Sequence, residues 1–174
     1  MKRYLFGLLL LLVSCNAATN NKHLERGRAD VVALEEGGTV RGTVDFVEVA
    51  EGLRIFANIQ GLSPGKHGIH VHEYGDLSDQ GMAAGGHYNP DDVKHGFVVE
   101  DGFKEAHPGD FGNLTADENG DAELELFVPG LRLSGGKYNI AGRAIIIHED
   151  EDDFSQPTGD AGDRIGGGVI IITK

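Results

Sequence analysis

The stretch TVRGTVDFVEVAEGLRIFANIQGL, residues 39–62, decides the fold class of this chain. Apolar and polar side chains partly alternate along it and β-branched residues are frequent, a pattern that is typical of strands with one buried face. Gly52 separates residues 39–50 from residues 53–62. The stretch therefore predicts two consecutive β-strands.

The same pattern recurs along the rest of the chain, and no amphipathic helical stretch competes with it. Two strands are expected within residues 114–128, on either side of the turn signal Asn119-Gly120. The remaining expected strands cover residues 31–36, 66–74, 141–149 and 166–174. Short strands at this spacing predict an all-β, antiparallel sandwich or barrel of about eight strands.

Two segments do not fit the strand pattern, residues 75–110 and residues 149–166. Both are rich in Gly and Asp, and the first also contains His87, His95 and His107. Loops of this length are uncommon in compact domains unless they have a function. We therefore expect the chemistry of the protein to lie in these two long loops.

The first fifteen residues, MKRYLFGLLLLLVSC, have the pattern of an export signal. Lys2 and Arg3 precede an apolar run that is shorter than the roughly 20 residues of a membrane-spanning helix. The sequence LVSC, residues 12–15, resembles the lipobox of bacterial lipoproteins, in which the cysteine is acylated and becomes the mature N-terminus. Cys15 is the single cysteine of the chain, which favours lipidation over ordinary secretion with an incidental cysteine.

These features divide the chain into three parts. We expect a lipoprotein-type signal peptide over residues 1–14, a lipidated Cys15 with a polar tether over residues 15–30, and one folded domain over residues 31–174. The protein would then be lipid-anchored in the cell envelope of a bacterium, facing the periplasm or the outer membrane. The net charge of −13 argues against nucleic acid as a partner, because phosphates require a basic surface.

Eight histidines are the strongest chemical signal in the sequence: His23, His67, His70, His72, His87, His95, His107 and His148. Seven of them lie outside the tether, in the expected strand 66–74, in the first long loop, or at the end of the expected strand 141–149. His70 and His72 would project from the same face of a strand, about 6.6 Å apart. Alone, this pair fits either a metal site or a solvated strand face. Clustered imidazoles with one carboxylate, such as Asp110 beside His107, suit zinc or copper.

Six short motifs, in order and correctly spaced, are similar to the signatures of the copper–zinc superoxide dismutase family. They are GIHVHEYGD (68–76), GGHYNP (85–90), KHG (94–96), HPGDFGNLTADENG (107–120), GRAIIIHEDEDD (142–153) and GDAGDRIGGGV (159–169). The resemblance implies an eight-stranded antiparallel Greek-key β-barrel, a flattened immunoglobulin-like sandwich, with both long loops over one outer face. It also implies conversion of superoxide to dioxygen and hydrogen peroxide by Cu²⁺/Cu⁺ cycling, with a structural zinc ion.

The resemblance also implies a role for each residue of the site. The implied copper ligands are His70, His72, His87 and His148, and the implied zinc ligands are His87, His95, His107 and Asp110. His87 would bridge the two metals and carry a catalytic proton, and Arg164 would dock superoxide. Asp152 would accept hydrogen bonds from His70 and His95, and His67 would support the barrel without binding metal.

The chain departs from the family pattern at an expected disulfide, because the two family cysteines align with Gly81 and Gly167. We therefore expect zinc to contribute more than usual to the order of the first long loop. A second departure lies in EDEDDFSQPTGDAGD, residues 149–163, where Asp150 and Pro157 replace the lysines of the animal enzymes. Steering of an anion depends on positive potential, so we expect a slower enzyme with weak or inverted salt dependence.

Two questions stay open at this level. The competing function is a non-catalytic periplasmic protein that binds or donates copper or zinc, and the presence of every implied ligand and of Arg164 favours the enzyme. The second open question is the oligomeric state: the family's two-fold dimer buries an apolar patch near EYGD, residues 73–76, and the last strand, which favours a homodimer, whereas bacterial relatives use a different face or remain monomeric.

Overall fold

The computed structural model describes residues 24–173. Its nine strands are β1 (Arg26–Ala33), β2 (Arg41–Val49), β3 (Gly52–Gln60), β4 (Gly65–His72), β5 (Asp110–Ala116), β6 (Ala122–Pro129), β7 (Ala144–His148), β8 (Arg164–Val169) and β9 (Ile171–Thr173). The first long loop adds a 3₁₀ turn, Met82–Ala84, and the short helix α1, Val98–Asp101. None of the helices in this described part is long and apolar enough to cross a membrane.

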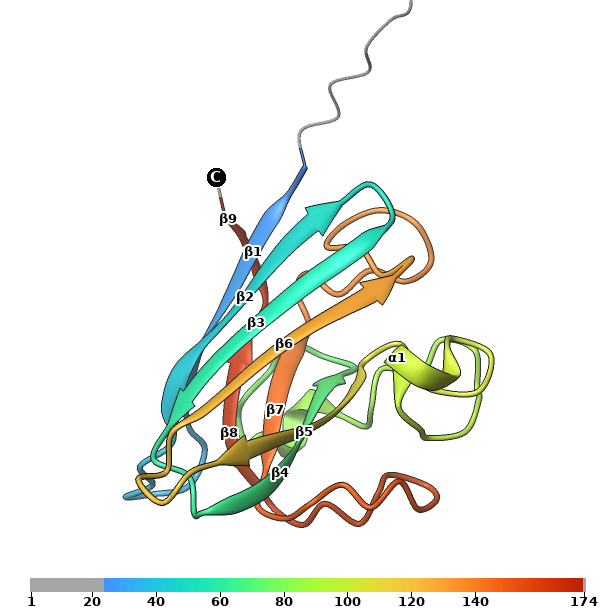
Figure 1. Ribbon diagram of the computed structural model, residues 1–174. Coiled ribbons are helices and arrows are strands. Elements are labelled where there is room, and N and C mark those ends of the chain that lie inside the picture. The colour runs from blue at the N-terminus through green and yellow to red at the C-terminus, as the bar shows by residue number, and fades with distance from the viewer. Residues whose placement is uncertain (1–23, 174) are drawn as a thin grey trace, which may run out of the picture.

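The strands form one closed antiparallel sheet in the order β2-β3-β6-β5-β4-β7-β8-β1-β9, and an additional pairing of β1 with β2 closes the barrel (Figure 1). The neighbours β3–β6 and β4–β7 are distant in sequence, which is the Greek-key connection. The expected eight-stranded barrel is confirmed, with β9 as a short extra strand.

The first strand begins earlier than expected. Residues 26–30, assigned from the sequence to the polar tether, lie in β1 and pair with β2 from Arg26 to Val31, so that assignment is wrong for these five residues. Gly27, Ala29 and Val31 alternate inward with exposed neighbours. The small size of Gly27 and Ala29 hides this alternation from a hydrophobicity pattern. The signal peptide, Cys15 and the rest of the tether lie outside the described residues.

The last expected strand, 166–174, is two strands in the structure. β8 pairs with β7 and with the end of β1, whereas β9 pairs only with the beginning of β1. The break falls at Ile170, whose side chain is fully buried and whose backbone N–H donates to the carbonyl oxygen of Arg143. The chain bends there because this residue leaves the ladder to enter the core.

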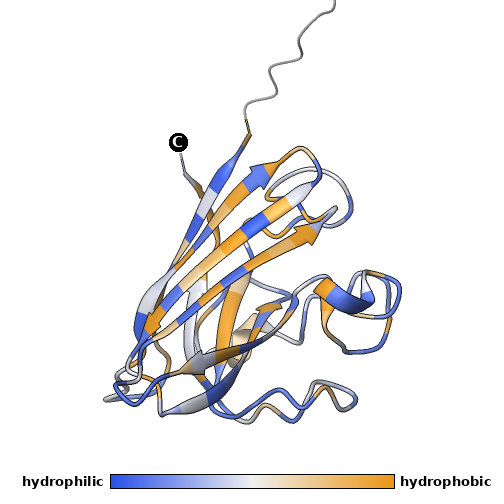
Figure 2. Cartoon of the chain, viewed as in Figure 1, coloured by the Kyte–Doolittle hydropathy of each residue, from blue (hydrophilic) through white to orange (hydrophobic). Residues whose placement is uncertain are grey.

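The barrel interior is filled by the inward face of each strand. Figure 2 shows hydrophobic and hydrophilic residues following one another along the strands β2 and β3, and in β3 the buried residues Leu53, Ile55, Ala57 and Ile59 alternate with exposed ones. At about 25 cal/mol per Å² of apolar surface, this burial is the main stabilising contribution to the fold. It gives the site a rigid support.

Both long loops lie against the strands β4 and β5 (Figure 1). The first loop returns to β4, where the N–H of Tyr88 donates to the carbonyl oxygen of Val71 at 2.8 Å and the N–H of Val71 donates to that of Gly109 at 2.9 Å. The second loop does so through the N–H of Gly68, which donates to the carbonyl oxygen of Asp150 at 2.9 Å. The outer face of β4 is therefore covered by the loops and is not exposed to solvent.

Candidate metal centre

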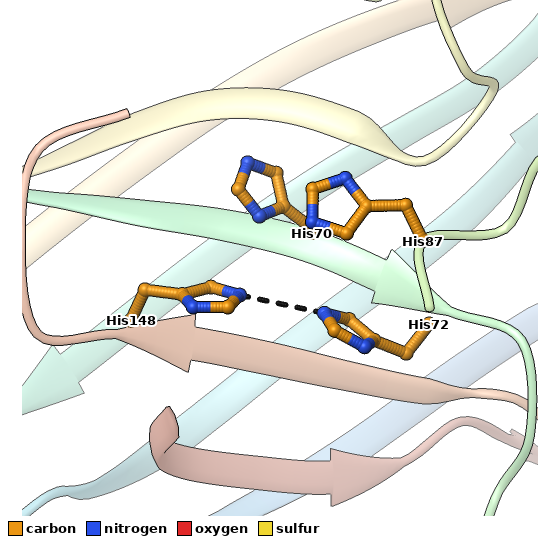
Figure 3. A group of neighbouring side chains, drawn as sticks. All are labelled: His70, His72, His87 and His148. Atoms are coloured by element: carbon orange, nitrogen blue, oxygen red, sulfur yellow. Dashed lines mark hydrogen bonds between the residues drawn. The ribbon is translucent and has the colours of Figure 1, made fainter. Parts of the chain in front are cut away.

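Strand β4 is buried on both faces, which explains how a strand can carry two histidines in a dry environment. Ile69 and Val71 point into the barrel core, while His70 and His72 point to the face that the loops cover, and all four are 0–1 % exposed. Figure 3 shows His70 and His72 on β4 together with His148 from the end of β7 and His87 from the first loop. One ring nitrogen from each of these four histidines lies within 4.8 Å of the others.

The pair His72 and His148 shows that this group fits a cation. Nδ1 of His72 donates to the carbonyl oxygen of Gly85 at 3.0 Å, and Nδ1 of His148 donates to that of Gly162 at 3.2 Å. The two Nε2 atoms then direct their lone pairs toward each other, 3.4 Å apart (Figure 3). Burial lowers the pKa of His72 to about 2 and that of His148 to about 3, so a proton does not fill this role at neutral pH.

His70 offers a third lone pair. Its Nε2 donates to Oδ2 of Asp152 at 2.8 Å, which places the ring proton there. The other nitrogen, Nδ1, is buried and has no hydrogen-bond partner among the described residues. A buried nitrogen without a partner is costly, so a metal ion bound here would satisfy it.

A second group gathers around the carboxylate of Asp110, at the beginning of β5. The Nδ1 atoms of His87, His95 and His107 lie 3.0, 2.8 and 3.0 Å from its oxygens. Burial would raise the pKa of Asp110, yet hydrogen bonds from the three imidazoles hold it well below its usual range. Three imidazoles and one carboxylate form a four-ligand set of the kind that zinc prefers.

His95 shows how strongly this second group requires positive charge. Burial lowers its pKa, but the hydrogen bonds to Asp110 and Asp152 outweigh burial and raise the pKa to about 9. Two buried carboxylates thus hold a proton on this ring. A divalent cation on Nδ1 would supply the same charge and leave the imidazole neutral.

His87 belongs to both groups. Its Nδ1 faces Oδ1 of Asp110 at 3.0 Å, which leaves Nε2 for the group of His70, His72 and His148. Burial lowers the pKa of His87 to about 4, so its ring is neutral at physiological pH. After loss of its remaining ring proton, this imidazole could bind two metal ions at once, one on each nitrogen.

Asp152 connects the two groups by contacting one histidine of each. Its Oδ1 lies 2.9 Å from Nε2 of His95 and its Oδ2 lies 2.8 Å from Nε2 of His70, the contacts expected from the sequence. The side-chain amide of Asn113 donates to the Asp152 backbone carbonyl at 2.9 Å and its oxygen accepts from the Asp152 N–H at 2.8 Å. A Cβ on Gly159 would come within 1.8 Å of Oδ1 of Asp152, so only glycine fits there.

Asn113 and Gly159 are therefore functional residues that the sequence reasoning did not assign. Both lie inside motifs that carried the resemblance, HPGDFGNLTADENG and GDAGDRIGGGV, which is the signal that could have identified them. The role of Asn113 depends on a contact across 39 residues, and that of Gly159 on the fold of the second loop around Asp152, neither of which local patterns reveal.

His67 lies apart from both groups. Its Nδ1 donates to the carbonyl oxygen of His148 at 3.0 Å, and its Nε2 lies 3.2 Å from Oγ of Ser63. Both nitrogens are thus used within the barrel, and the first of these bonds fixes the end of β7, from which the His148 side chain projects.

A cavity of about 640 Å³ opens beside the first group of histidines. His72, His87 and His148 line it together with Arg164, at the beginning of β8. The carboxylates that line it are Glu35, Glu149, Asp160 and Asp163, and the lining contains no lysine among residues 24–173. Glu35 comes from the turn between β1 and β2, a contribution that the sequence did not suggest.

The comparisons with known proteins agree with this geometry. The family model for copper/zinc superoxide dismutase matches residues 40–170. A superoxide dismutase [Cu-Zn] of Paramecium bursaria Chlorella virus 1 is 41% identical over 174 residues, 95% of this chain and 90% of the relative. An extracellular superoxide dismutase [Cu-Zn] of Caenorhabditis elegans is 36% identical over 173 residues, 94% of this chain and 76% of the relative.

The fold matches a solved structure as well. The crystal structure of the clock protein EA4 superposes with a TM-score of 0.75 at 37% identity, covering 85% of this chain and 94% of that one. Barrel, loops, histidine groups and sequence similarity point to one class, the metal-dependent β-barrel oxidoreductases. The chain belongs to the copper/zinc superoxide dismutase family, whose cofactors are copper and zinc.

The Asp152→Asn variant tests the bridging carboxylate. An amide is neutral and has one acceptor oxygen in place of two, so it holds the N–H groups of His70 and His95 less strongly and fixes the two rings less well. We expect metal affinity to fall by about 10- to 100-fold, measured by competition with a chelator. Asp153→Asn, in the exposed neighbour, is the matched control, and equal affinities for the two variants would contradict the prediction.

Proposed function

We propose that the two groups of side chains are the two metal sites of a superoxide dismutase. His70, His72, His87 and His148 would hold copper, and His87, His95, His107 and Asp110 would hold zinc. The observation that carries the proposal is the pair of Nε2 atoms of His72 and His148, 3.4 Å apart with their protons committed elsewhere. The donor chemistry supports the assignment, since the set with the carboxylate suits zinc and the all-imidazole set suits copper.

Bound copper would supply one-electron redox chemistry, through which two superoxide anions and two protons become dioxygen and hydrogen peroxide. The contribution of this chain is to bind the anion, orient it and supply a proton. The Arg164 guanidinium is permanently charged and lines the same cavity as His72, His87 and His148, so it would attract and orient superoxide there. His87 would take up a proton at Nε2, the nitrogen that does not face Asp110, and deliver it to the product.

Asp152 and His67 would act through the histidines. Asp152 holds a ring proton of His70 and of His95 on Nε2, so that Nδ1 of His70 is free to bind metal and Nδ1 of His95 becomes free when a cation replaces its proton. His67 holds the carbonyl of His148 and thereby the end of β7. The alternative function, storage or donation of metal without turnover, would need neither the guanidinium in the cavity nor an imidazole shared by two sites. Both features favour the enzyme.

We propose the cell envelope of a bacterium as the location, with Cys15 lipidated and the domain exported on its signal peptide. The support comes from the first fifteen residues, which lie outside the described part, and from the extracellular forms named among the relatives. Mass spectrometry of the purified protein tests this proposal. A mature chain that begins at Cys15 with an added acyl mass supports it, and an unmodified Cys15 contradicts it.

A homodimer is part of the same proposal. Tyr74 of EYGD is 54 % exposed, and Ile171 and Ile172 of the last strand are 55 % and 47 % exposed. Exposed apolar side chains at both expected positions support burial against a second copy. Light scattering on the purified protein gives the mass directly, and a monomer at micromolar concentration would contradict this part of the proposal.

The His148→Ala variant tests the reaction itself. Superoxide decay, followed by stopped flow, should be fast with the copper- and zinc-loaded protein and should fall toward the copper-free level in the variant, because one of four copper ligands is lost. The control variant Glu118→Gln, in the exposed turn between β5 and β6, is expected to give the same rate of superoxide decay as the unchanged protein. Stoichiometric copper binding without catalysed decay would place the chain in the storage or donor class.

The charge of the cavity gives a second prediction. Four carboxylates surround one guanidinium, so the field opposes entry of an anion and salt should weaken that field. We expect the rate constant to stay level or to rise as ionic strength increases. Glu35→Gln should raise the rate at low salt about two- to threefold, whereas Glu36→Gln, at an exposed position outside the cavity, should not. A steep fall in rate with added salt would refute the prediction.

A further inference from the structure

Arg164 is held in the cavity by two backbone carbonyls. Its Nη1 donates to the carbonyl oxygen of Gly81 at 2.6 Å, and its Nη2 donates to that of Gly85 at 2.7 Å. Burial lowers the pKa of the guanidinium, and within residues 24–173 both of its side-chain hydrogen bonds go to these carbonyls. The position of this charge therefore depends on the position of residues 77–86, which we call the carbonyl segment.

The carbonyl segment has few fixed points. Internal backbone bonds fold it, such as the N–H of Gly81 donating to the carbonyl oxygen of Leu77 at 3.1 Å. Near its end, the N–H of Tyr74 donates to the carbonyl oxygen of Ala84 at 2.9 Å and ties it to the chain after β4. No disulfide can hold it within the described residues, because the single cysteine of the chain is Cys15.

A small apolar cluster connects the carbonyl segment to the barrel. Its fully buried members are Ala84, Ala144 and Ile146, and the partly buried Leu34 and Leu77 pack against them. Leu34 follows β1, and its backbone N–H donates to the carbonyl oxygen of Ile165 at 3.1 Å, which fixes it beside β8. The cluster thus joins the turn after β1, the barrel strand β7 and the carbonyl segment.

Leu34 occupies the gap between the carbonyl segment and β8. A Cβ built on Gly81 would lie 2.7 Å from Cδ1 of Leu34, and one built on Gly167 would lie 3.1 Å from the same atom. One methyl group therefore sits against two glycines, one on the segment and one on β8. Glycine at both positions makes room for the leucine.

We propose that Leu34 is a positioning residue for substrate binding: by filling the gap between Gly81 and Gly167, it holds the Gly81 carbonyl against Arg164 and thereby fixes the guanidinium in the cavity. Leu77 completes the contact from the segment side. The inference rests on the proposed role of Arg164 in binding superoxide. In this chain, side-chain packing and not a covalent cross-link would hold the carbonyl segment against β8. The turn after β1 would thereby contribute to the active site.

The test uses azide as an anion probe, titrated into the copper- and zinc-loaded protein and followed by the copper absorption band. Arg164→Ala should weaken azide binding about tenfold or more, as expected for the loss of one charge-assisted contact. Leu34→Ala should weaken it about fivefold, and the double variant should bind like Arg164→Ala alone. Hydrogen exchange of residues 78–86 in the zinc-loaded, copper-free protein should become faster in Leu34→Ala.

Two further variants separate positioning from general destabilisation. Leu126→Ala removes a partly buried leucine from β6, packed against the main core and distant from the cavity, and should lower the melting temperature without changing azide affinity. Leu34→Met keeps the reach of the side chain and should restore azide binding. Where Leu34→Ala does not fold, Leu34→Val, which is shorter by one carbon, takes its place in the same comparison.

The outcomes distinguish the two proposals. Azide affinity that is unchanged in Leu34→Ala but weakened in Arg164→Ala overturns the role of Leu34 alone. Losses that add in the double variant overturn it as well, because Leu34 would then act independently of the arginine. Unchanged affinity in Arg164→Ala overturns the role of Arg164, and the inference about Leu34 with it.

Discussion

The structure depends above all on one buried carboxylate, that of Asp152, which is 0 % exposed and accepts hydrogen bonds from His70 and His95. Burial of a charge is costly unless hydrogen bonds and opposite charge compensate it. Here the compensation comes from a strand histidine and a loop histidine, and Asn113 fixes the backbone behind them. The strands β4 and β5 and both long loops meet at this group, so the second loop can take only the path that delivers Asp152.

The barrel supports the buried group around Asp152 because its paired strands hold the attached side chains in fixed positions. β4 and β7 pack one face into a hydrophobic core and present the other to the loops, and His70, His72 and His148 project from that second face. The loops then add His87, His95 and His107 at points where they return to the strands. Site residues on paired strands are held more precisely than residues on loops.

The sequence predicted β2 and β3 well because large apolar residues alternate there with polar ones, and it predicted the histidine groups because their motifs keep a fixed spacing. It misplaced the beginning of β1, where the buried residues include Gly27 and Ala29, and it did not separate β9 from β8. The roles of Asn113, Gly159 and Leu34 were not predictable in this way. Asn113 and Leu34 depend on partners that are distant along the chain and come together only when the barrel closes, and Gly159 depends on how the second loop folds around Asp152.

The two sets of side chains differ in charge, and this difference determines how each set would bind a cation. The set around Asp110 contains a carboxylate whose pKa is held low and a histidine whose pKa is raised to about 9, so without metal it already attracts a positive charge. The other set consists of neutral imidazoles, and burial lowers the pKa of His72, His87 and His148 to about 4 or below. A divalent cation is therefore bound mainly by charge at the set around Asp110 and mainly by free nitrogen lone pairs at the imidazole set. Since His87 belongs to both sets, a cation in the carboxylate set would fix the His87 ring that the imidazole set also needs. On the proposed assignment, zinc would therefore prepare the copper site through this shared side chain.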